Sequence, residues 1–181
     1  MSQENIRHYQ KRVFDKHLDI RYNSRMKYPI VTGAESAVLR KKTLPVEDPC
    51  ASDIQTLIAD MFVAMHEADG VGLAAPQIGV SIRLAVIEIN GEKLVLINPT
   101  LSAHDDDKIL FEEGCLSLPG QFLAIERYET VTVDYQDEKG ADQKLTTSGL
   151  LAIAIQHEID HLDGILIVDR YDESLLKHYA L

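Results

Sequence analysis

The sequence predicts an α+β fold in which antiparallel β-sheets pack around one central, buried helix. Two observations carry this prediction. β-rich runs alternate with turn residues through the middle of the chain, and one segment near the C-terminus is apolar on almost every side at helical spacing. A chain of 181 residues with 45% hydrophobic residues can form one domain with a substantial core.

The first predicted helix covers residues 52–68. Ser52 and Gln55 stand at the spacing of a capping box, and Gly70 lies just beyond the helix end. The apolar residues that recur at helical intervals are Ile54, Leu57, Ile58, Met61, Phe62 and Met65. This periodicity predicts an amphipathic helix on the outside of the sheet.

Two β-hairpins are predicted from turn chemistry. The dipeptide Asn90-Gly91 favours a type I′ turn, and the polar residues 137–140 mark a second turn. The predicted strands are residues 82–89, 93–97, 130–135 and 144–147. A sheet that is built from hairpins is largely antiparallel.

The central helix is predicted at residues 148–163, with Gly164 able to end it, and a short C-terminal helix at residues 172–179. The polar residues of the central helix are Gln156, His157, Glu158, Asp160 and His161. Two histidines four positions apart share one helix face at a spacing that fits one metal ion, and the glutamate between them is a candidate general base. A hydrogen-bonded pair of buried histidines would give the same pattern.

A catalytic metal site takes three protein ligands and leaves one position open, so the two histidines need a partner. The metzincin pattern requires a histidine six residues after His161, where Ile167 stands. A glutamate ligand from a later helix, as in thermolysin-like enzymes, could only be Glu173. It is the weaker candidate, because it lies on a predicted surface helix. Cys115, flanked by Gly114, offers a soft thiolate, although a lone cysteine is more often a small buried hydrophobic residue.

A glycine-rich segment, Gly-Val-Gly-Leu-Ala-Ala-Pro-Gln, covers residues 70–77. It matches the dinucleotide-binding pattern GxGxxA only superficially, because it follows a helix and runs into Pro76 instead of following a strand and opening a helix. The segment is better suited to a close approach of the backbone to a substrate, with Gln77 as an amide donor. A turn whose Gln77 faces solvent is the alternative.

Charge and composition exclude several classes of function. The net charge of −11 argues against broad nucleic-acid binding. Residues 1–28 are the exception, with seven basic residues against three acidic ones. Two cysteines, Cys50 and Cys115, and no apolar run of membrane-spanning length favour a cytoplasmic protein. We expect residues 1–27 to be a basic surface extension, with an organellar transit peptide as the alternative, and residues 28–181 to be one catalytic domain.

Three segments in this order, residues 70–77, 113–117 (Glu-Gly-Cys-Leu-Ser) and 156–161 (Gln-His-Glu-Ile-Asp-His), resemble the signature motifs of peptide deformylase. The resemblance covers roughly residues 27–170. It implies a metal-dependent hydrolase that removes the formyl group from the N-terminal formylmethionine of new polypeptides and releases formate. It further implies one divalent ion per chain, foremost Fe²⁺ with Zn²⁺, Ni²⁺ or Co²⁺ as alternatives, and N-formylmethionyl nascent peptides as binding partners. We expect a monomer, and the positive charge of the N-terminal segment alone motivates a transient contact with ribosomal RNA as the alternative to a plain surface arm.

The resemblance also implies a role for each matching residue. The metal ligands would be Cys115, His157 and His161. The catalytic residues would be Glu158 as general acid and base, with the Gln77 side chain and the Leu116 backbone N–H as donors to the oxyanion. The substrate-binding residues would be Gly70, Val71, Gly72, Leu73, Gly114, Leu150 and Ile153. The first four would form a wall that excludes an acetyl group, and the two helix residues would line the methionine pocket, although both also suit an ordinary core.

One position departs from the family pattern. Many bacterial members carry an arginine near the position of Phe122, where it contacts the peptide backbone of the substrate, and this chain has Arg127 only further on. Two other readings compete with a deformylase. A zinc endopeptidase would need a third ligand other than Cys115, and a relative that only binds formylated peptides would not need Glu158.

Overall fold

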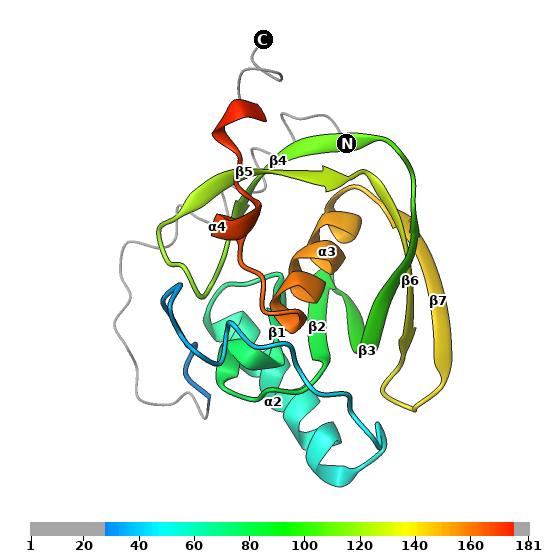
Figure 1. Cartoon of the computed structure of the whole chain (residues 1–181). Coiled ribbons are helices and arrows are strands. Elements are labelled where there is room, and N and C mark those ends of the chain that lie inside the picture. The colour runs from blue at the N-terminus through cyan, green and yellow to red at the C-terminus, as the bar shows by residue number, and fades with distance from the viewer. Residues whose placement is uncertain (1–27, 176–181) are drawn as a thin grey trace.

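The computed structural model describes residues 28–175, which form an α+β fold as predicted (Figure 1). The helices are α2 (Ser52–Glu67), the 3₁₀ helix η1 (Ala75–Ile78), α3 (Leu150–Leu162) and α4 (Ile167–Arg170). The strands are β1 (Gly72–Ala74), β2 (Leu84–Ile89), β3 (Glu92–His104), β4 (Lys108–Gly114), β5 (Phe122–Tyr128), β6 (Thr130–Gln136) and β7 (Asp142–Ser148). Within this part of the chain, no helix is long and apolar enough to cross a lipid bilayer.

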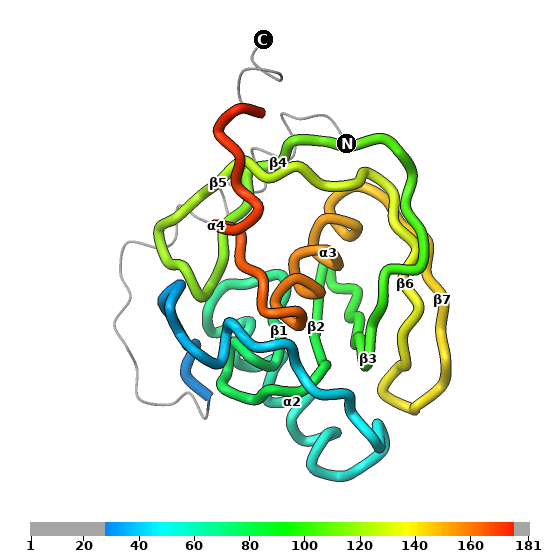
Figure 2. The backbone as a smooth tube through the Cα atoms, viewed as in Figure 1, coloured from blue at the N-terminus to red at the C-terminus, as the bar shows by residue number. Residues whose placement is uncertain are grey.

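Two antiparallel sheets surround the central helix α3. The larger sheet has the strand order β1-β2-β3-β6-β7, and β4 pairs with β5 in a second, two-stranded sheet. The long strand β3 changes register against β6 at two places, and such irregularities bend a strand. Figure 2 shows β3, β6 and β7 curving together past α3, so that the strands enclose the helix.

Strand β2 explains how the larger sheet holds a helix on each face. Leu84 and Val86 belong to the core cluster around α2, whereas Ala85 and Ile87 belong to the cluster around α3. All four side chains are fully buried, and successive side chains of a strand point to opposite faces. The sheet therefore separates α2 from α3, which places the amphipathic helix on the outside as predicted.

The predicted amphipathic helix is confirmed, but its predicted capping box is wrong. The N-cap is Ala51, with no side-chain cap, so Ser52 is already the first helical residue and its carbonyl accepts a hydrogen bond from the Thr56 hydroxyl. The Gln55 side chain instead donates to the carbonyls of Pro49 and Glu138. Gln55 thus ties the start of α2 to the turn between β6 and β7.

Both predicted hairpins and the central helix are confirmed. Asn90 and Gly91 have φ angles of 56° and 82°, the left-handed values that a type I′ turn requires. The carbonyl of Leu162, in the last turn of α3, accepts hydrogen bonds from the backbone N–H and the hydroxyl of Thr43, both at 2.9 Å. Of the C-terminal helix predicted at residues 172–179, residues 173–175 are helical and Asp172 is not, while residues 176–179 lie outside the described residues, as do residues 1–27.

Candidate active site

The three predicted metal ligands meet at the middle of α3. Cys115 follows the last residue of β4, and the two histidines lie one turn apart on α3. Their ligand atoms all lie within 4.8 Å of one another, with Cys115 Sγ 3.2 Å from His161 Nε2. Among the described residues, this is the one group of three such side chains close enough to hold a metal ion. Glu173, the weaker candidate, is exposed.

Glu158 lies on the same helix, next to His157, and its side chain is buried. Burial raises its pKa from 4.5 to about 7. Its Oε2 atom and the Nδ1 atom of His161 are the two buried side-chain polar atoms in residues 28–175 without a hydrogen-bond partner. Buried polar atoms are nearly always paired, so these two indicate that the site receives further polar groups from outside the chain.

The donor set fits a divalent transition metal. The Nδ1 atom of His157 lies 2.7 Å from Glu113 Oε2, and donation to this carboxylate leaves Nε2 of the ring as a lone-pair donor. One soft thiolate with two imidazoles suits zinc and ferrous iron. Together with the unpaired Glu158 oxygen, these groups suit a metal that keeps an open position.

The two histidines of the cluster differ in protonation. Burial acts to lower the pKa of His157, but the neighbouring Cys115 and Glu113 outweigh it and raise the pKa well above 6.5. Burial, together with the charges of His157 and Arg127, lowers the pKa of His161 well below 6.5. In the metal-free protein His157 therefore carries the proton that a metal must displace.

The glycines of the first motif bring strand β1 against the catalytic helix. A Cβ atom at Gly72 would lie 2.3 Å from Glu158 Oε1, and one at Gly70 would lie 2.7 Å from Leu116 Cδ1. Both distances are shorter than any van der Waals contact. Leu73 points to the other face of the sheet, into the cluster around α2, so only its backbone faces the site. Val71 is partly buried beside them.

Gln77 is held in place on η1 and is only 1% exposed, so the solvent-facing alternative is wrong. Its Oε1 atom accepts a hydrogen bond from the Ala74 N–H at 2.8 Å, which orients the amide. Its Nε2 atom then donates to Ser117 Oγ at 3.3 Å and lies 3.8 Å from Cys115 Sγ. The amide donor is therefore directed at the cluster of metal-binding side chains.

The two predicted pocket residues on α3 line up with the first histidine. Ile153 is four positions and Leu150 seven positions before His157, so all three lie on one side of the helix. Ile153 is 3% exposed, while Leu150 is partly buried. Gly114, the last residue of β4, stands beside Cys115 and opposite Phe122 in the strand register. The Phe122 side chain is 44% exposed.

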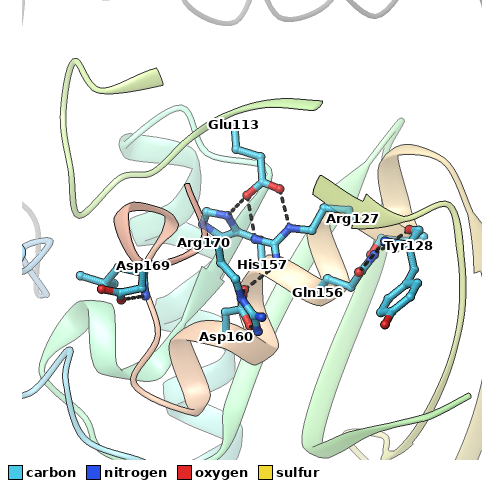
Figure 3. A network of polar contacts seen from close by, with 10 residues as sticks. Glu113, Arg127, Tyr128, Gln156, His157, Asp160, Asp169 and Arg170 are labelled. Atoms are coloured by element: carbon cyan, nitrogen blue, oxygen red, sulfur yellow. Dashed lines mark hydrogen bonds and ion pairs between the residues drawn. The ribbon is translucent and has the colours of Figure 1, made fainter. Parts of the chain in front are cut away.

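A buried ionic network supports the site and was not foreseen from the sequence (Figure 3). Arg127 of β5 donates to both oxygens of Glu113, at 2.6 and 2.9 Å, and to Asp160 of α3 at 2.5 Å. Burial opposes the charge of Glu113, but Arg127 and His157 hold the pKa of this carboxyl down at about 2. Because the guanidinium of Arg127 is occupied in this way, it is not available to contact the peptide backbone of a substrate.

The signal for this network lies in strand alternation. Leu123, Ile125 and Arg127 share one face of β5, and Glu113 stands opposite Leu123 on β4. A charged residue on the apolar face of each of two paired strands predicts a buried ion pair. Gln156 also finds its partners here, because its amide oxygen and nitrogen bind the backbone N–H and carbonyl of Tyr128.

A cysteine sulfur and two imidazoles within reach of one ion, beside a buried carboxyl that can exchange a proton near neutral pH, define a metal-dependent hydrolase. The family model described as polypeptide deformylase matches residues 27–176. This match spans most of the chain, so the chain belongs to the peptide deformylase family.

Similar proteins agree in sequence and in fold. A peptide deformylase of Roseiflexus castenholzii is 46% identical over 164 residues, covering 81% of this chain and 88% of the relative. The structure of a Synechococcus elongatus peptide deformylase in complex with actinonin has a TM-score of 0.80 at 39% identity and covers 88% of this chain and 89% of its own. A Met-Ala-Ser-bound enzyme of Acinetobacter baumannii has a TM-score of 0.74 at 32% identity and covers 79% of this chain and 97% of its own.

The chain is therefore an enzyme that hydrolyses the N-formyl group of N-terminal formylmethionine in newly synthesised polypeptides and releases formate. Its activity depends on a metal ion, for which the cluster of one cysteine and two histidines is the candidate site. Its substrates are formylated nascent peptides.

Proposed function

We propose that Cys115, His157 and His161 bind the catalytic ion and that this ion is Fe²⁺ in the native enzyme, with Zn²⁺, Ni²⁺ or Co²⁺ as substitutes. The observation that carries this proposal is the convergence of the three ligand atoms within 4.8 Å, beside a buried carboxylate oxygen without a partner. A divalent ion held there would acidify the attacking water and polarise the formyl carbonyl.

Glu158 is the general base and later the general acid in this proposal. With a pKa of about 7 in the metal-free protein, its carboxyl can take the proton from the attacking water and return it to the departing amine near neutral pH. Strand β1 fixes the position of the carboxylate, because the missing side chain of Gly72 is what admits Oε1. Glu158 thereby faces a substrate carbonyl from one fixed direction.

Gln77 and Leu116 stabilise the oxyanion that forms at the formyl oxygen. The Gln77 amide is oriented before substrate arrives, since its oxygen is already bound to the Ala74 N–H. The backbone N–H of Leu116 follows directly after the ligand Cys115. Donors that are fixed in advance stabilise a developing charge without the cost of reorganisation.

The substrate would lie along residues 70–73, beside the cluster of Cys115, His157 and His161. The backbone of residues 70–73 is packed tightly against Glu158 and Leu116, which supports its role as a wall against the extra methyl of an acetyl group. Leu150 and Ile153 continue the His157 side of α3 and would line the methionine pocket, with Gly114 at its edge. The Met-Ala-Ser-bound relative supports the binding of a short peptide that begins with methionine.

The cellular setting belongs to the same proposal. The enzyme would act in the cytoplasm as a monomer, and residues 28–181 would form the catalytic domain after a basic extension of residues 1–27. The net positive charge of that extension is the one feature that supports a transient contact with ribosomal RNA. Deleting residues 1–27 should then reduce ribosome cosedimentation at low salt without changing turnover, and unchanged cosedimentation would rule the contact out.

The deciding experiment measures formate release from formyl-Met-Ala-Ser by protein purified without oxygen and loaded separately with Fe²⁺, Ni²⁺ or Zn²⁺. We expect metal-dependent release that is fastest with Fe²⁺ and absent in Glu158→Ala, although this variant still binds one ion. Cys115→Ser should lose the ion. An active Cys115→Ser enzyme would remove the cysteine from the ligand set and favour an endopeptidase-like site. Comparable activity on acetyl-Met-Ala-Ser would refute the proposal that residues 70–73 exclude an acetyl group.

A further inference from the structure

A series of charged hydrogen bonds connects the proposed metal ligand His157 to the surface of the protein (Figure 3). It passes through three side chains that are each at most 9% exposed, Glu113, Arg127 and Asp160. It ends at Arg170 of α4, whose side chain is 47% exposed. Nη2 of this arginine donates to Asp160 Oδ1 at 2.6 Å, and its Nε donates to Oδ2 at 3.1 Å.

The three buried side chains between His157 and Arg170 carry one net negative charge. Glu113 and Asp160 are two buried carboxylates that share the single buried guanidinium of Arg127. Arg170 supplies the second positive charge and binds both oxygens of Asp160. Arg127 can then bind Glu113 with two nitrogens, and a bidentate pair of this kind fixes the orientation of the carboxylate.

We propose that Arg170 is a positioning residue for the metal ligand His157, to which it is connected through these three buried side chains. Without Arg170, Asp160 keeps only its bond to Arg127 and attracts this guanidinium more strongly. The hold of Arg127 on Glu113 weakens, and with it the hydrogen bond that orients the imidazole. The inference rests on the proposed metal site.

A second ion pair on the same segment separates this role from a merely structural one. Arg40 pairs with Asp169, the residue before Arg170, and also donates to the carbonyl of Ala34. This pair fastens α4 to the segment after Tyr28 without contacting Asp160. Arg40→Ala is therefore a matched control, because it removes an arginine that anchors α4 and leaves the series to His157 intact.

The test uses the full-length enzyme loaded with Co²⁺, whose ligand-field and thiolate charge-transfer bands report the geometry of the ligands. The rate of Co²⁺ release to a chelator is measured together with the spectrum. Loss of a group that orients a ligand directly costs about 10- to 100-fold in metal affinity, so we expect the lower end, about tenfold faster release, for Arg170→Ala. Its bands should shift, Arg170→Lys should restore most of the retention, and Arg40→Ala should match the wild type.

Two results would overturn the inference. One is an Arg170→Ala enzyme with wild-type release and spectrum, and the other is an Arg40→Ala enzyme with the same defect, which would mean that anchoring of α4 is the whole effect. Arg170→Gln serves if the alanine variant does not fold, and it should release Co²⁺ faster than the lysine variant. If the wild type itself fails to bind one equivalent of Co²⁺, the proposed ligand set is wrong and the inference falls with it.

Discussion

The His157 imidazole and the Glu113 carboxylate lie 2.7 Å apart, although 44 residues separate them in the sequence. Glu113 accepts this hydrogen bond while Arg127 binds both of its oxygens, so the carboxylate cannot turn away from the ring. A carboxylate fixed in this way sets both the tautomer and the direction of the imidazole. The second motif thus supplies a group that aims a ligand of the third motif, in addition to its own cysteine.

Replacing Glu113 by glutamine should weaken metal binding by about 10- to 100-fold, because the amide is neutral and no longer holds the His157 ring through a charged bond. Metal affinity is measured by competition with a chromophoric chelator. Glu112→Gln, on the exposed side of the same strand, is the control and should bind metal normally. Equal affinities in the two variants would show that Glu113 is a structural residue only.

Replacing Gln77 by alanine should lower kcat by about 10²- to 10³-fold, the usual effect of losing one oxyanion donor. Metal content should stay at one ion per chain, since the Gln77 amide lies 3.8 Å from the cysteine sulfur and is not among the metal-binding groups. Gln77→Glu, which keeps the shape but removes the N–H donors, should be at least as slow. Near-normal turnover in either variant would exclude Gln77 from the mechanism.

Gly72→Ala should lower kcat/KM by about 10²-fold, because the new methyl would occupy the place of Glu158 Oε1 and displace the base by about 1 Å. Gly70→Ala is the matched comparison. Its methyl would meet the end of the flexible Leu116 side chain, which can move aside, so its loss of activity should be smaller. Steady-state kinetics on formyl-Met-Ala-Ser would show which variant loses more activity. A milder defect in Gly72→Ala than in Gly70→Ala would contradict the prediction.

Glu158 should make the metal-free protein less stable as the pH rises. Burial raises the pKa of this carboxyl from 4.5 to about 7, so the folded chain binds more protons than the unfolded chain between these values. The stability that the neutral carboxyl allows is present below pH 4.5 and is lost as the pH rises through 7. Between these two pH values the free energy of unfolding should fall by about 3 kcal/mol, at about 1.4 kcal/mol for each pH unit.

Glu158→Gln isolates this effect, because glutamine resembles the neutral carboxyl and does not ionise. Urea unfolding of both metal-free proteins should give similar free energies near pH 4.5 and a more stable variant at pH 8. The same substitution should abolish formate release. A variant that is not more stable at pH 8 would mean that Glu158 ionises in the folded chain as easily as in water.

Local patterns predicted the parts of the fold whose causes are local. The apolar spacing of residues 52–68 and the dipeptide Asn90-Gly91 were sufficient for α2 and the first hairpin. The capping box failed because a spacing of three cannot tell whether Ser52 is the N-cap or the first helical residue. Strands β4 and β5 were not predicted, since charged residues interrupt their apolar alternation and find partners only in the tertiary structure.

The candidate site also contains residues that local patterns predicted and residues that depend on the tertiary structure. Gln77, Cys115 and the histidines of the third motif were selected by side-chain chemistry and spacing and then by resemblance to known motifs, and the structure brings them together. The Arg127 bridge between Glu113 and Asp160 was not predicted. Strand alternation indicates the pair of Glu113 and Arg127 only once β4 and β5 are known to pair, and Asp160 comes from a third element. The catalytic roles proposed for the motif residues remain predictions for the experiments above.

The links between Glu113, Arg127 and α3 also form a closed ring. His157 and Asp160 are three positions apart on one helix, and their partners Glu113 and Arg127 bind each other on adjacent strands. Two charged links from one sheet to the same side of a helix resist rotation of the helix about its own axis, in addition to its apolar packing on the larger sheet. The two-stranded sheet therefore contributes to the rotational angle of α3, and with it to the direction in which its histidines point.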